Sequence, residues 1–125
     1  MNEGYVKYQC NWTKEEIGIP EEIFQSLEKY RSDLYKLGLI GMYPDGIGFG
    51  NISVQSSPNT FYITGSATGQ FANLGTHHYA KVLSYSFVQN SLTCVGLTKA
   101  SAESLTHAAV YEVVHEAKAV VDRKS

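Results

Sequence analysis

The sequence predicts an α+β fold, a layered α/β/α sandwich with a mainly antiparallel central sheet. Three observations predict it. A helical apolar pattern comes first, several short β-type runs follow, and a second helical pattern leads into a final apolar triplet. No helical segment separates the middle strands, whereas adjacent parallel strands need a long crossover between them. The order of elements therefore favours an antiparallel sheet over a βαβ arrangement.

The first helix is predicted over about residues 20–37. Pro20 suits the first helical position, and Gly38 is suited to the position just after the helix. Glu21 and Glu22 place negative charge where the helix dipole favours it. The apolar residues of this segment recur at spacings of one, three and four, which gives one apolar face: Ile23, Phe24, Leu27, Tyr30, Leu34 and Leu37.

Four short strands are predicted in the middle of the chain. Runs at 51–55 and 60–64 are separated by the turn SSPN, and runs at 79–88 and 92–95 bracket a second turn. The segments that precede and divide them are rich in glycine and are predicted to be loops.

A second helix is predicted over about residues 102–116, with Ser101 as its N-cap. Its inward-facing residues are predicted to be Leu105, Ala108, Ala109 and Val113. The apolar triplet at 119–121 predicts the beginning of a last strand.

Composition limits the classes of function. The 125 residues, 43% of them apolar, are enough for one domain, which we place at 19–125 behind an N-terminal arm at 1–18. A net charge of −2 gives no basic footprint for nucleic acid. No apolar run is long enough to cross a membrane, so a cytoplasmic protein with no membrane partner is expected. Cys10 and Cys94 form no CxxC pair, and two reduced, buried thiols are expected.

Three segments could converge on a bound anion. They are Gly50–Ser53, Gly65–Gly69 and Lys99–Ser101, which offer backbone N–H groups, hydroxyls and a helix N-terminus. The alternative is that the Gly-rich segments are plain turns, which is the commoner role of such sequences.

Glu103 is the only acidic residue between Asp45 and Glu112. It could act as a general acid or base beside the anion, or it could only compensate the dipole of the helix that begins at Ser101.

The histidines do not form a metal site by spacing. His77 and His78 are adjacent, and on a strand their rings would point to opposite faces. His107 is expected to be a core histidine or to lie behind a site, and His115 to be on the surface. No HxH, HxxxH or CxxC spacing occurs, so no metal ligands are assigned.

Four motifs together resemble the class II aldolase/adducin family over about residues 20–125. They are GIGFGNIS at 46–53, FYITGSATG at 61–69, LTKASAESLTHAAVYE at 97–112 and KAVV at 118–121. The resemblance, to a family that includes fuculose-phosphate aldolase, implies a metal-dependent lyase that cleaves a carbon–carbon bond of a sugar phosphate with zinc or another divalent metal. It also implies that Asn51, Thr68, Gly69 and Ser101 bind the substrate phosphate and that Glu103 is the acid/base residue beside the metal.

The chain departs from the family pattern at the metal ligands. Ala102 stands where the family has a second serine, and Asp122 and Lys124 stand where it has His-x-His. The last ligand of the family would follow Ser125. These departures predict a truncated member with no metal cofactor in this chain and with impaired or no lyase activity. The alternatives are a non-catalytic binding or structural module like the adducin head, or an enzyme whose metal site another chain completes.

The resemblance also bears on assembly. Active family members look like symmetric tetramers, and the strands and helix that would cover the last strand are absent from this sequence. An uncovered strand edge and apolar face favour burial against a second copy. We therefore expect a homo-oligomer.

Overall fold

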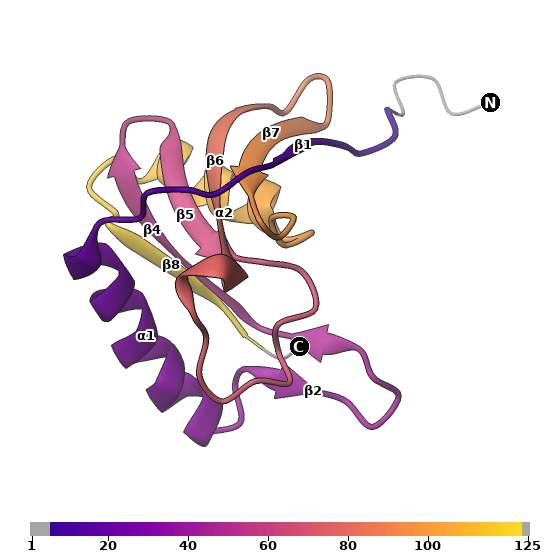
Figure 1. Cartoon of the computed structure of the whole chain (residues 1–125). Coiled ribbons are helices and arrows are strands. Elements are labelled where there is room, and N and C mark those ends of the chain that lie inside the picture. The colour runs from indigo at the N-terminus through magenta and orange to yellow at the C-terminus, as the bar shows by residue number, and fades with distance from the viewer. Residues whose placement is uncertain (1–5, 124–125) are drawn as a thin grey trace.

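The computed structural model describes residues 6–123 of the chain. Six strands form one sheet in the order β1-β7-β6-β5-β4-β8, in which every pair is antiparallel except β1 and β7. Figure 1 shows this sheet with the short β2–β3 hairpin projecting from its lower edge. The strands are β1 (Gln9–Lys14), β2 (Gly41–Met42), β3 (Gly48–Phe49), β4 (Asn51–Ser57), β5 (Thr60–Thr64), β6 (Tyr79–Ser86), β7 (Ser91–Gly96) and β8 (Ala119–Asp122).

Two α-helices pack against the sheet, α1 (Glu21–Lys36) and α2 (Ser104–Val113). On β5, Tyr62 packs in the cluster that α1 completes with Leu27, whereas Phe61 packs in the cluster that α2 completes with Ala108. Successive strand residues point to opposite faces, so the two helices lie on opposite faces of the sheet. The helix predicted over 20–37, the four middle strands and the α+β class with a mainly antiparallel sheet are confirmed.

The second helix is shorter than predicted. It begins at Ser104 rather than 102 and ends at Val113 rather than 116, because residues 102–103 form a turn first. Ser101 is therefore not the N-cap, although its Oγ accepts the N–H of Glu103 at 3.2 Å. The prediction that Val113 faces inward was wrong, since Val113 is 79% exposed. The buried positions are Ser104, His107, Ala108 and Tyr111, a helical stripe that a search for aliphatic residues alone does not find.

The adjacent histidines do not lie on a strand. Thr76–His78 is a 3-10 turn before β6, and the ring centroids of His77 and His78 are 4.0 Å apart. The opposite-face geometry that applies to a strand does not apply here, because the turn places successive side chains closer in direction than a strand does. His107 is fully buried and His115 is exposed, as predicted.

Part of the segment assigned to an N-terminal arm is built into the sheet. β1 pairs along its whole length with β7, and the Trp12 indole N–H donates to the carbonyl of Gly96 at 2.9 Å. No strand was predicted there, because the mixed sequence QCNWTK has no clear alternation. No helix within residues 6–123 is both long enough and apolar enough to cross a membrane.

Candidate functional site

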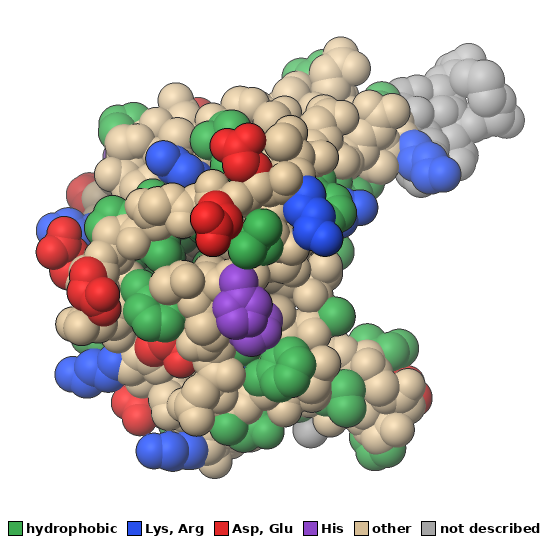
Figure 2. Space-filling view, viewed as in Figure 1, with side chains coloured by type: hydrophobic (Ala, Val, Ile, Leu, Met, Phe, Trp, Pro, Cys, Tyr) green, Lys and Arg blue, Asp and Glu red, His purple; other side chains and the backbone are tan. Residues whose placement is uncertain are grey.

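A cleft of about 420 Å³ opens where the β2–β3 hairpin, the loop after β5, the turn before α2 and the end of β8 meet. Figure 2 shows it as the hollow on the right-hand side, between the projecting hairpin and the body of the domain. Its lining residues are Tyr43, Gly48, Phe49, Gly50, Asn51, Gly65, Ser66, Ala67, Thr68, Gly69, Ser101, Ala102, Glu103, Asp122 and Arg123.

The site residues chosen from the sequence come together here: Asn51, Thr68, Gly69, Ser101 and Glu103 all line this one cleft. Backbone hydrogen bonds hold two of the three segments side by side. The amide of Ser66 donates to the carbonyl of Lys99 at 2.8 Å, and that of Ser101 donates to the carbonyl of Thr64 at 3.1 Å. The convergence therefore follows from the pairing of the chain after β5 with the chain before α2.

The loop at 65–69 is shaped largely by its own packing. The Thr68 hydroxyl donates to the carbonyl of Gly65 at 2.8 Å and is almost buried, so it closes the loop. A Cβ on Gly65 would lie 2.2 Å from the side chain of Thr98, and one on Gly69 would lie 2.2 Å from the carbonyl oxygen of Gly41. These two glycines are required by close packing, whether or not an anion binds.

Ala67 has a φ of 61°, in the left-handed region that residues with a Cβ seldom adopt. This strained residue lies in the wall of the cleft. Backbone outliers of this kind tend to gather at functional sites.

A buried arginine supports this loop from behind. Arg31 of α1 is 1% exposed, and its guanidinium donates to the carbonyl of Thr68 at 2.9 Å and to that of Ala72 at 3.3 Å. Glu28, one turn earlier, accepts the N–H of Leu74 at 3.0 Å and the hydroxyl of Tyr79 at 2.7 Å. Helix α1 thus fixes the path of the loop that forms one wall of the cleft.

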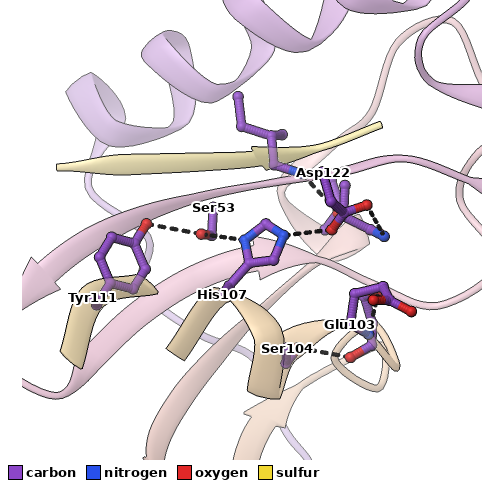
Figure 3. Close-up of polar contacts among 10 residues, drawn as sticks. Ser53, Glu103, Ser104, His107, Tyr111 and Asp122 are labelled. Carbon is purple, nitrogen blue, oxygen red and sulfur yellow. Dashed lines mark hydrogen bonds and ion pairs between the residues drawn. The ribbon is translucent and has the colours of Figure 1, made fainter. Parts of the chain in front are cut away.

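A chain of polar side chains runs from the core to the cleft, as Figure 3 shows. His107 Nε2 lies 2.5 Å from Asp122 Oδ2, and His107 Nδ1 lies 2.7 Å from the hydroxyl of Ser53. The Ser53 hydroxyl lies 2.8 Å from that of Tyr111. At the other end, the Asn51 amide donates to Asp122 Oδ1 at 3.3 Å.

The hydrogen bonds between these four side chains can be assigned one consistent set of donors and acceptors. An ionised Asp122 accepts the Nε2 proton of His107, so Nδ1 accepts the Ser53 proton and Ser53 accepts that of Tyr111. Burial raises the pKa of Tyr111 to about 12, which keeps its proton in place at neutral pH. The Asp122 carboxylate is thereby held at the cleft by two donors.

Ser53, His107 and Asp122 are the residue types of a hydrolytic triad, but their arrangement does not suit one. Ser53 is fully buried and its oxygen is bonded to both His107 and Tyr111, so no substrate can reach it. The member that borders the cleft is Asp122. The sequence placed Ser53 in a segment expected to bind an anion, but its hydroxyl is buried and bonded away from the cleft. Tyr111 was given no role, although the spacing of four between His107 and Tyr111 places both on one face of α2.

The described residues do not fit a zinc site. Within residues 6–123 no group of three His, Cys, Asp or Glu side chains is placed to share a metal ion. The acidic groups that line the cleft are Glu103 and Asp122, and both ring nitrogens of His107 are already bonded. A catalytic zinc takes three protein ligands. Lys124, the other substituted position, lies outside the described residues.

The comparison with protein families decides which family this is. The model of the Class II Aldolase and Adducin N-terminal domain matches residues 34–121. The chain belongs to this family. The matched region contains Asn51, Ser101, Glu103 and His107 and ends just before Asp122. No curated protein matches the chain.

Proposed function

We propose that this domain of the class II aldolase/adducin family binds a small sugar-phosphate-like anion in the cleft and has little or no carbon–carbon lyase activity by itself. The observation that carries the proposal is the convergence of Asn51, the 65–69 loop and the Ser101 turn around one cleft. The family match supports a small-molecule ligand.

The donors for an anion come from the 65–69 loop and the turn before α2. Ser101 accepts the N–H of Glu103 through Oγ, which leaves its own hydroxyl proton for a ligand. The N-terminus of α2 adds a favourable dipole, and Arg123 adds a cation at the rim.

Two carboxylates oppose the binding of an anion. Glu103 and Asp122 line the same cleft, and Ala102 supplies no hydroxyl. Their repulsion makes a dissociation constant on the order of 1 mM a reasonable expectation, equivalent to about 4 kcal/mol of binding free energy.

The family implies a divalent metal that would polarise the substrate carbonyl, but the donors described here do not fit zinc. We therefore assign no step through a metal. Glu103 is the candidate acid/base residue, because its exposed carboxylate borders the cleft and, among the residues that the structure describes, forms no hydrogen bond that would hold it away from a ligand.

The second candidate function is a non-catalytic binding module. It is favoured by the bonding of Asp122, each of whose two oxygens already accepts a hydrogen bond, one from His107 and one from Asn51. Assembly into a homo-oligomer stays a prediction under either function.

NMR titration tests the binding proposal. Inorganic phosphate and ribose 5-phosphate are added separately to the labelled chain, and amide shifts are expected in residues 50–53, 65–69 and 99–103. Ser101→Ala should weaken binding several-fold, because it removes a donor, whereas Ser56→Ala near the exposed end of β4 should not change it. If neither compound shifts amides in any of the three segments, the proposed site is wrong.

Lyase activity is tested separately with the same chain. Fuculose 1-phosphate is incubated with and without added Zn²⁺, and the aldehyde product is measured. Rapid cleavage that Glu103→Gln abolishes would contradict the proposed lack of activity.

A further inference from the structure

The two cysteines, 84 residues apart in the sequence, meet at one edge of the sheet. Cys10 lies on β1 and Cys94 on β7, and their sulfur atoms are 3.6 Å apart. In the parallel register Cys10 is opposite Leu92, and Cys94 is two residues further along β7, so the two side chains point to the same face. Sequence spacing alone gave no sign of this contact.

We propose that Cys10 and Cys94 are a modification site at which a hydroperoxide forms a reversible disulfide that fastens β1 to β7. This inference is independent of the ligand assigned to the cleft.

The two thiols differ in access, which sets the order of the reaction. Cys10 is half-buried on the edge strand, whereas Cys94 is 1% exposed in the core cluster under α2. Burial raises the pKa of the Cys94 thiol to about 11, so very little of it is thiolate at neutral pH. Cys10 is therefore the thiol that meets the oxidant.

The reaction balances with a hydroperoxide as the only oxidant. The Cys10 thiolate attacks the terminal peroxide oxygen and the O–O bond breaks. Cys10 becomes a sulfenic acid, and an alcohol or water is released. Cys94 sulfur then attacks the Cys10 sulfur, which releases the sulfenic oxygen as water and forms the S–S bond. Two thiols are oxidised by two electrons, and the peroxide takes both.

The surroundings suit an oxidised Cys10. The hydroxyl of Tyr8 is buried close to both thiols, and within residues 6–123 its hydrogen-bonding neighbour is the sulfur of Cys10, a weak acceptor. A sulfenic oxygen on Cys10 would be a stronger acceptor for this buried hydroxyl. The sulfur atoms must then approach by about 1.5 Å to reach the disulfide distance. Strand β1 pairs only with β7 and can shift at the sheet edge.

The disulfide would tie the N-terminal strand to the strand that leads into the cleft. Strand β7 ends at Gly96, and the chain then passes through Thr98, which packs against Gly65, to Ser101 at the cleft. Opening of β1 and movement of this cleft wall would both be restrained.

Hydrogen peroxide at a small molar excess tests the proposal on the 125-residue chain. The expected product is a monomer that has lost two hydrogen masses, yields one cross-linked peptide joining Cys10 to Cys94, and reverts with a thiol reductant. In Cys94→Ser, dimedone should label Cys10 as the sulfenic acid, whereas in Cys10→Ser it should not label Cys94.

Three outcomes would overturn the proposal. They are two free thiols after peroxide treatment, covalent dimers through Cys10, and oxidation of Cys10 to the sulfinic acid without a cross-link. Mapping of the wild-type chain decides among them even if a variant fails to fold.

Discussion

His107 Nε2 lies 2.5 Å from Asp122 Oδ2, so a fully buried imidazole on α2 is bonded to a carboxylate that borders the cleft. The helix and the last strand of the sheet are thereby joined by a polar contact at the site itself. Ser53 and Tyr111 continue the contact into the core, where every one of these polar groups has a partner. Such a network stabilises the fold only while it is complete.

Replacing His107 by alanine should therefore lower the free energy of unfolding by about 3 kcal/mol, since it leaves a cavity and removes the partner of Ser53 and Asp122. Urea denaturation measures the change. His115→Ala, on the exposed surface, is the matched control and should stay within about 0.5 kcal/mol of the wild type. A loss below 1 kcal/mol in His107→Ala would show that the network contributes little.

The purified 125-residue chain should carry no tightly bound zinc. Both oxygens of Asp122 accept hydrogen bonds, from His107 and Asn51, and within residues 6–123 no three potential ligand side chains are placed to share a metal ion. Elemental analysis after dialysis checks this. About one zinc per chain that survives mild chelation would contradict it and would mean that ligands outside residues 6–123 complete a site.

Much of the fold could be predicted because its signals are local. The apolar face of α1 around Leu27 and the turns at 58–59 and 87–90 fix those elements within a few residues. The inward face of α2 was predicted only in part because its buried stripe contains Ser104, His107 and Tyr111, which are inward only because each finds a polar partner.

The convergence of the candidate residues on one cleft could be predicted, but their hydrogen bonding could not. Family motifs located Asn51, Ser101 and Glu103, and the structure brings them to one cleft. The contact of Cys10 with Cys94 depends on the pairing of β1 with β7, two segments that are distant in the sequence. A single sequence does not encode that contact in any local pattern.

Gly69→Ala should destabilise the domain by about 2 kcal/mol and displace the cleft wall, because the new Cβ would lie 2.2 Å from the Gly41 carbonyl oxygen. Thermal or urea unfolding gives the first result, and amide shifts in 41–50 and 65–69 give the second. Gly18→Ala is the control, since no atom lies within 4 Å of its added Cβ. Equal stability of the two variants would mean that the loop and hairpin are not in this close contact.

Arg31→Lys tests whether α1 holds the cleft loop in place. The guanidinium reaches the carbonyls of both Thr68 and Ala72, and a single ammonium cannot reproduce that geometry. Burial also lowers the pKa of Arg31, and a buried ammonium is more readily deprotonated than a guanidinium. We expect a loss of about 2 kcal/mol in the free energy of unfolding, faster amide hydrogen exchange across 65–74, and weaker binding of phosphate.

The reverse exchange at an exposed site of the same helix, Lys36→Arg, is the matched control and should leave all three measurements unchanged. If Arg31→Lys loses stability without faster amide exchange in 65–74, Arg31 stabilises the domain through its packing and does not hold the loop in place. In that case the shape of the cleft wall would depend on Glu28 and on the close contact at Gly69 instead.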